Sequence, residues 1–185
     1  MSRGKFLIAA ILVALLQTAA IAGIMYKRAH EISTGQEVIL ESRFVDPRDL
    51  FRGHYVILNL NVGQLENATT EIDFTFKRQE DVFVELEEGE NGFWVARKLW
   101  HEIPSDHISV FIKGKILRTP LKKTDRYQIN FPQDRYFAPK KRAKELEKFR
   151  RDQQLGVILS IAPNGAGYIK GITIAGDRIY DEPLW

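Results

Sequence analysis

The sequence GVILSIAPNGAGYIKGITIAGDRIY, residues 156–180, indicates most directly how this chain folds. Two apolar runs, Gly156–Ala162 and Gly167–Ile174, flank the turn sequence Pro163-Asn164-Gly165. Apolar runs of strand length on both sides of such a turn are typical of a hairpin. Because a last short strand is expected near Arg178–Tyr180, the C-terminal region predicts antiparallel β-sheet.

Several runs closer to the N-terminus place apolar residues at every second position, which is typical of half-buried strands. These runs are Val38–Phe44, Val56–Val62, Ile72–Phe76, Val82–Leu86, Ile108–Ile116 and Tyr127–Phe131. The turn EEGENG, residues 87–92, joins one run to Phe93–Leu99 and predicts a second hairpin. Gly114 is an expected β-bulge. We therefore predict a mainly β fold, either a β-sandwich or a partly open barrel, with antiparallel strands.

One amphipathic helix is predicted near the C-terminal third. Pro139 suits the first helical position, and the strong helix formers KKRAKELEKFRRDQQ follow it. A narrow apolar stripe leaves a basic surface made of Lys140, Lys141, Arg142, Lys144, Lys148 and Arg151. This surface could lie on anionic headgroups or on a partner's acidic loop. It could equally face solvent or the acidic strands of the same chain.

The N-terminal sequence FLIAAILVALLQTAAIAGIMY, residues 6–26, contains no charge. As a helix it spans about 30 Å, the thickness of the hydrocarbon core of a bilayer. We predict a signal anchor over residues 1–28, a linker over 29–36 and a β-rich extracytoplasmic domain over 37–185. The favoured placement is a single pass through the cytoplasmic (inner) membrane, with the N-terminus inside and the main domain periplasmic. The alternative is a signal peptide cleaved after Ala22.

Charge and composition exclude several classes of protein. The 185 residues include 27 Lys and Arg, 24 Asp and Glu, and no Cys. The whole chain has a net charge of +3, and residues 1–28 alone carry +4, so residues 29–185 have a net charge of −1. This nearly neutral charge gives no support for binding nucleic acid. The lack of Cys excludes disulfides, thiol catalysis, Cys-ligated metals and a lipoprotein anchor.

No motif specifies a catalytic residue, a cofactor or a metal site, and we predict none. His101, Glu102 and His107 match no zinc-binding spacing, and surface histidines in a loop are the simpler interpretation. Trp94 and Trp100 could form an aromatic face for sugar rings, although aromatic residues in strands more often belong to the core.

The sequence VDPRDLFRGHYVILNL, residues 45–60, is the most distinctive stretch of the chain. It contains the polar and turn-forming residues Asp46, Pro47, Arg48, Asp49, Arg52, Gly53 and His54, followed by Tyr55 and Leu58. In a structural interpretation, Asp46-Pro47 opens a turn and Gly53 permits a positive φ before the next strand. In a functional interpretation, a ligand or a partner binds to a patch made of Arg48, Arg52, His54 and Tyr55.

This stretch resembles the signature of the GDYXXLXY family of membrane-anchored bacterial proteins. Gly53, Tyr55 and Leu58 match the motif, whereas His54 replaces its Asp and Leu60 its final Tyr. The sequence Arg135–Pro139 and the segments after it are similar to the second half of the family. The resemblance implies an anchored extracytoplasmic domain, no catalytic residue, and an integral membrane protein with several spans as partner.

The favoured function is an interaction or assembly module that docks with a membrane partner. The alternatives are a cell-envelope enzyme acting on glycan or peptide and a small-ligand sensor domain. We leave open whether the protein is an enzyme, although an interaction module requires no reaction.

Overall fold

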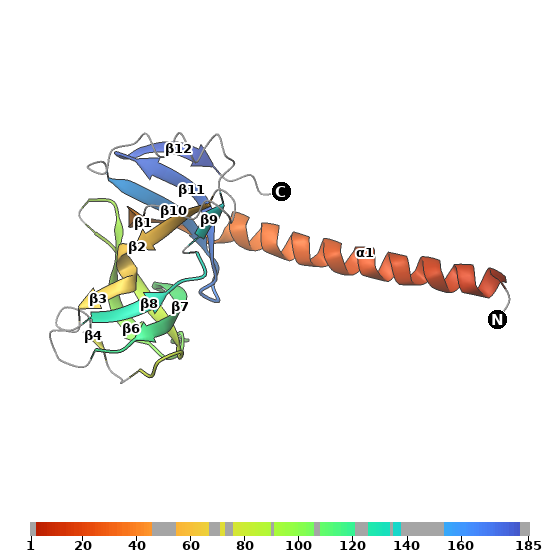
Figure 1. Ribbon diagram of the computed structural model, residues 1–185, viewed down its shortest axis with the longest axis horizontal. Helices are drawn as coiled ribbons and strands as arrows, with labels where there is room; N and C mark the ends of the chain where they lie inside the picture. The colour runs from red at the N-terminus through yellow and green to blue at the C-terminus, as the bar shows by residue number, and fades with distance from the viewer. Residues whose placement is uncertain are drawn as a thin grey trace.

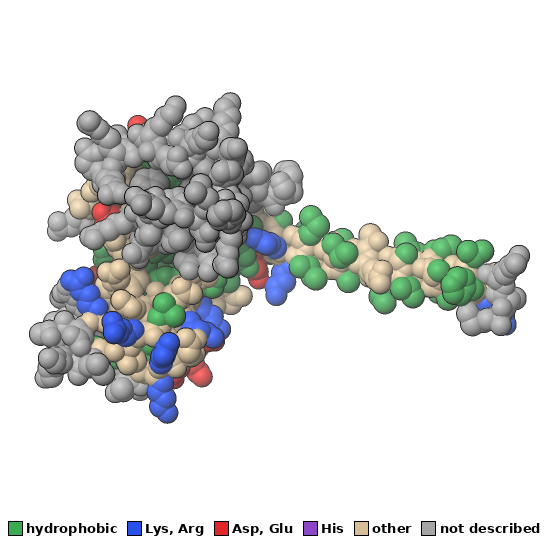
Figure 2. All heavy atoms as spheres, viewed as in Figure 1, with side chains coloured by type: hydrophobic (Ala, Val, Ile, Leu, Met, Phe, Trp, Pro, Cys, Tyr) green, Lys and Arg blue, Asp and Glu red, His purple; other side chains and the backbone are tan. Residues whose placement is uncertain are grey.

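The computed structural model describes residues 3–45, 55–66, 71–72, 76–89, 91–105, 108–120, 126–133, 135–137 and 154–181. One long helix, α1 (Arg3–Thr34), extends away from a β-rich body (Figure 1). Hydrophobic side chains cover this helix, and charged ones gather where it meets the body (Figure 2). The helix is long and apolar enough to cross a membrane, and its apolar window buries nothing against the rest of the chain. A signal sequence would share these properties.

The β-rich body is built around one sheet. Its strands are β1 (Gln36–Val45), β2 (Tyr55–Leu60), β3 (Gln64–Glu66), β4 (Glu71–Ile72), β5 (Asp81–Glu88), β6 (Trp94–Trp100), β7 (Val110–Arg118), β8 (Arg126–Asn130), β9 (Arg135–Phe137), β10 (Leu155–Ile161), β11 (Gly167–Ile174) and β12 (Asp177–Asp181). A short 3₁₀ helix, η1 (Asn61–Gly63), joins β2 to β3. The main path runs β12-β11-β10-β1-β6-β5-β7-β8-β3, and its nine strands form a half barrel.

The mainly β prediction is confirmed, but the sheet is mixed and not antiparallel throughout. Strand β6 lies parallel to β1 at Leu40 and Trp94, and parallel to β4 at two positions. Strands far apart in the sequence become neighbours there, so no hairpin turn fixes their direction. The helix predicted after Pro139, together with its basic surface, lies outside the described residues.

The alternating patterns predict the core well. Val38 and Leu40 of β1 are fully buried, and so are Val82 and Val84 of β5. Leu60 and Val62 continue this core at the end of β2 and in η1. These side chains belong to one hydrophobic cluster with members in β1, β2, β3, β5, β6, β7, β8, β10 and β11. Its continuity indicates that the described strands fold as one unit.

Both predicted hairpins are present, but the predicted bulge is misplaced. Gly114 pairs regularly with Val82, and the irregularity in β7 lies between Ile116 and Arg118. A Cβ at Gly114 would lie 2.5 Å from Ile129 Cγ2, so close packing explains this glycine.

Candidate functional site

The most elaborate polar arrangement that the structure describes lies where α1 meets the sheet. The predicted linker, residues 29–36, is helical through Thr34, and β1 begins at Gln36. Gly35 alone therefore separates helix from strand. Its N–H donates to the carbonyl of Glu31 at 3.1 Å, which closes the last turn of the helix.

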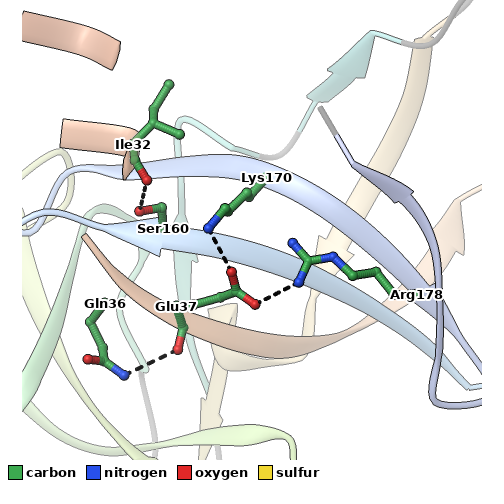
Figure 3. Close-up of polar contacts among 6 residues, drawn as sticks. All are labelled: Ile32, Gln36, Glu37, Ser160, Lys170 and Arg178. Carbon is green, nitrogen blue, oxygen red and sulfur yellow. Dashed lines mark hydrogen bonds and ion pairs between the residues drawn. The ribbon is translucent and has the colours of Figure 1, made fainter. Parts of the chain in front are cut away.

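The hydroxyl of Ser160 makes the first cross-link between helix and sheet. Ser160 lies in β10 and is completely buried. Its Oγ donates to the carbonyl oxygen of Ile32 at 2.7 Å (Figure 3). The carbonyl groups in the last turn of a helix have no partner within the helix, so this hydroxyl satisfies one of them.

Tyr168 of β11 makes the second cross-link. Its hydroxyl donates to a carboxylate oxygen of Glu31, and the guanidinium group of Arg28 lies 5.8 Å from the centre of its ring. Lys27 also approaches Glu31, at 3.9 Å on the same helix. The hydrogen bond to Glu31, burial and the negative charge of Glu31 raise the pKa of Tyr168, while Arg28 acts against them. The hydroxyl therefore stays protonated and available as a donor.

An ion-pair cluster surrounds the start of β1. Lys170 and Arg178 converge on the two carboxylate oxygens of Glu37, at 2.9 Å and 3.0 Å (Figure 3). The hydrogen bond from Lys170 is the largest cause that lowers the pKa of Glu37, and the two positive charges add to it. The cluster joins β1, β11 and β12 directly after the helix ends. We call Arg28, Glu31, Ile32, Gly35, Glu37, Ser160, Tyr168, Lys170 and Arg178 the helix–sheet junction.

A second feature is a groove of about 320 Å³ between β6 and the η1–β3 segment. Glu41 and Asn61 lie on its wall and hydrogen-bond to each other, and Phe93 and Trp94 supply an aromatic side. The groove forms where the edge of β1 passes from pairing with β6 to pairing with β2. Its volume suits a small ligand.

Most of the predicted interaction patch lies outside the described residues. This applies to Asp46, Pro47, Arg48, Asp49, Arg52, Gly53 and His54, and to the basic surface residues Lys140, Lys141, Arg142, Lys144, Lys148 and Arg151. Tyr55 and Leu58 lie in β2, where Tyr55 pairs with Phe137 and Leu58 with Phe44. The end of the motif is therefore a strand held between β1 and β9.

Among the weaker candidates, His101 and both tryptophans have structural partners. His101 lies 3.2 Å from Glu80 and packs on the ring of Phe76, Glu102 is exposed, and His107 lies outside the described residues. The described residues contain no group of three or more potential metal ligands. Trp100 donates its indole N–H to the buried Glu85 at 2.8 Å and does not line the groove, unlike Trp94. Trp94 lines the groove and packs against the core.

Sequence reasoning missed the junction residues. Ser160 and Tyr168 occur within strand patterns, and Glu31 lies in the segment interpreted as a linker. Glu31 and Tyr168 are 137 positions apart. The only local signal was a carboxylate and two basic residues at helical spacing directly after the apolar run.

The fold and the junction define a class of protein in which one long apolar helix carries a half-barrel β domain. A family model described as GDYXXLXY protein matches residues 17–172, which is most of the chain. The chain therefore belongs to the GDYXXLXY family, as its motif predicted. The match begins inside α1 and ends in β11, so it includes both sides of the junction. No curated protein and no solved structure gives a significant match.

Proposed function

We propose that this protein is a membrane-anchored, extracytoplasmic interaction module that holds its β domain at the surface of the inner membrane to dock with an integral membrane partner. The proposed order is a cytoplasmic N-terminus, a single span in α1 and a domain over residues 37–185 outside. The single observation that carries the proposal is the continuous, cross-linked connection between the apolar helix and the sheet.

The length of the connection determines how far the domain lies from the bilayer. The apolar run ends at Tyr26, and α1 continues for eight residues to Thr34. Eight helical residues rise by about 12 Å, whereas the headgroup region on one side of a bilayer is about 5–7 Å thick. The β domain would then begin only a few ångströms beyond the headgroups. A domain held at this distance from the bilayer would be able to contact the short extracytoplasmic loops of a membrane protein.

Rigidity favours docking over action on freely diffusing substrates. A flexible linker samples many orientations, and binding must then restrict them at an entropic cost. Here the junction fixes the orientation in advance through Ser160, Tyr168 and Glu31. A fixed height and a fixed face are useful when the partner lies in the same membrane plane, because they raise the effective concentration of the two surfaces.

The groove supports a second candidate, a small-ligand sensor or an envelope enzyme. Its combination of aromatic and polar walls suits a glycan or a peptide segment. The described part of the groove brings together one carboxylate, Glu41, whose oxygen is engaged by Asn61. We therefore rank ligand binding here above catalysis, and docking above both.

The test is a flexible insertion in the full-length, tagged protein. Four Gly-Ser residues after Gly35 would uncouple helix from sheet, and the same insertion in the exposed turn at Gly92, between β5 and β6, is the matched control. Lysine-reactive crosslinking in intact cells is followed by purification and mass spectrometry. We expect a membrane partner with the unaltered chain and the control, and strongly reduced crosslinking after the Gly35 insertion. A protein without a membrane partner, or one whose intact mass shows cleavage after Ala22, would overturn the proposal.

A further inference from the structure

The side chain of Gln17 lies at the middle of the apolar run. Residues 6–26 have their centre at residue 16, one position away. The side chain of Gln17 is exposed and makes no hydrogen bond to any residue that the structure describes. Its neighbour Thr18 differs, because its hydroxyl donates to the carbonyl of Ala14 at 2.9 Å within the helix. Gln17 is therefore the polar side chain of the span with no partner of its own in the described chain.

An unpaired amide at this depth is unfavourable. The hydrocarbon core offers no water to replace lost hydrogen bonds, and the backbone groups around Gln17 are engaged by the helix itself. The amide has both a donor NH₂ group and an acceptor oxygen. Another helix that presents a hydrogen-bonding side chain at the same depth can satisfy both.

The residues around Gln17 permit such a helix to approach. Each residue advances about 100° around the helix axis. Residues four and seven positions before or after Gln17 therefore point to nearly the same side of the helix. The side that carries Gln17 also carries Ala10, Val13, Ile21 and Ile24. We call these five residues the Gln17 face. Ala10 is small, and Ala14 and Ala20, three residues from Gln17, lie at the two edges of this face. Small residues let two helices in a membrane pack closely.

The junction shows where the β domain lies relative to this face. Arg28 follows Gln17 by 11 residues and therefore points within about 20° of the same direction. Arg28 lies against Tyr168 of β11, and Glu31 in the next turn bonds to the same tyrosine. The sheet therefore lies on the same side of the helix axis as the Gln17 face, just beyond the end of the apolar run. Two copies of the chain paired through this face would bring two β11 strands into the same space.

We infer that the Gln17 face binds a transmembrane helix of a different membrane protein, which carries a hydrogen-bonding side chain at mid-depth and ends below the level of Arg28. This inference rests on the proposed function and adds the contact surface inside the membrane. The partner helix lies beneath the β domain, so one rigid chain contacts the partner both within the bilayer and above it.

The test places a photoreactive residue in the full-length protein in its native membrane. One variant carries it at Ile21 on the Gln17 face, and a matched variant carries it at Leu15 on the opposite face. We expect Ile21 to crosslink to an apolar peptide of one integral membrane protein, with at least tenfold lower yield from Leu15. Gln17→Leu should lower the Ile21 yield about three- to tenfold, and Gln17→Asn should retain most of it.

The remaining outcomes separate this inference from the proposed function. Equal yields from both faces, no dependence on Gln17, or crosslinks to a second copy would overturn the inference. Lysine-reactive crosslinking of the same variants is the independent readout of docking by the β domain. If it still captures the membrane partner when Ile21 captures nothing, the Gln17 contact is wrong and the proposed function stands. If both fail, both are wrong. Membrane insertion of Gln17→Leu is checked by carbonate extraction.

Discussion

The hydroxyl of Ser160 donates a hydrogen bond to the carbonyl oxygen of Ile32 across 2.7 Å and joins the last turn of α1 to a completely buried strand. Both groups would be costly to leave unpaired, since one is a buried hydroxyl and the other an end carbonyl of a helix. The bond therefore holds the helix in one position on the sheet. In the proposed function, the position of the membrane relative to the β domain depends on this bond.

Replacing Ser160 with Ala tests this bond. The substitution leaves the carbonyl of Ile32 without its partner, and we expect the free energy of unfolding to fall by about 1–2 kcal/mol. Urea unfolding of the detergent-solubilised protein measures the loss, and hydrogen exchange should show faster exchange at the end of α1. Ser33→Ala is the matched control, because its hydroxyl bonds within the exposed helix at 3.0 Å. Equal effects of the two substitutions would contradict the role given to Ser160.

Gly35 permits the close approach of helix and sheet. A Cβ at this position would lie 2.9 Å from the carbonyl oxygens of Glu31 and Ile161, and would also meet the hydroxyl of Ser160. These are backbone atoms at both sides of the junction, so Gly35→Ala should destabilise it by about 1–3 kcal/mol.

Thermal unfolding of the detergent-solubilised protein, with limited proteolysis of the junction, measures this effect. The control is Gly23→Ala within α1, where an added Cβ meets nothing within 4 Å. If Gly35→Ala leaves thermal stability and proteolysis of the junction unchanged, the helix can shift without a loss of stability, and the prediction is wrong.

Two fragments without the apolar part of α1 separate the folding of the β domain from its attachment to the helix. The core cluster runs from Val38 to Ile174, so a fragment that begins at Glu31 should fold alone. A fragment that begins at Gln36 lacks Glu31 and Ile32, and we expect it to fold with about 1–3 kcal/mol less stability. Urea unfolding followed by tryptophan fluorescence compares the two. Aggregation of both fragments would mean that part of the assumed core is an interface.

Local patterns predicted much of the fold. The apolar run predicted α1, and the turn at Pro163-Asn164-Gly165 predicted the β10–β11 hairpin, in which Ala166 N–H donates to Asn164. Alternation identified Val38 and Leu40 as core residues because its period of two reports burial directly. These features depend on residues close in sequence, which is why one sequence suffices to find them.

Pairings between distant segments could not be predicted in the same way. The parallel contact of Leu40 with Trp94 follows from how the half barrel curves, and no turn between the two residues encodes it. The contact of Tyr168 with Glu31 likewise requires the complete sheet before it exists. The motif at Gly53–Leu60 identified the family but left the candidate site unassigned, because the junction residues carry no signature of their own.

The raised pKa of Tyr168 predicts sensitivity of the junction to alkaline pH. A pKa above the ordinary 10.0 means that the neutral phenol is favoured in the folded state. Its stabilisation is therefore fully present below pH 10 and is lost as the pH rises through the folded pKa. Tyr168→Phe should be less stable at neutral pH, by about 1 kcal/mol, and should lack this extra alkaline loss. Urea unfolding at several pH values, with absorbance titration of the tyrosines, checks both statements.

The ion pairs of Glu37 predict the opposite behaviour at acidic pH. Lys170 and Arg178 stabilise the carboxylate, so the pKa of Glu37 lies below its ordinary value of 4.5. The stabilisation is present above pH 4.5 and is lost as the pH falls through the folded pKa.

A double-mutant cycle with Glu37→Gln and Lys170→Met isolates this contribution from the other carboxylates of the chain. Because these side chains are partly exposed, we expect a coupling of about 0.5–1 kcal/mol at neutral pH, declining at acidic pH and in high salt. A second ion-pair cluster, formed by Asp81 with Lys113 and Lys115 on β5 and β7, is the matched control. If the Glu37 cluster stabilises the helix–sheet junction, its loss should accelerate proteolysis near Gly35. Loss of the Asp81 cluster should leave proteolysis near Gly35 unchanged. Equal proteolysis in both variants would restrict the Glu37 cluster to a local role within the sheet.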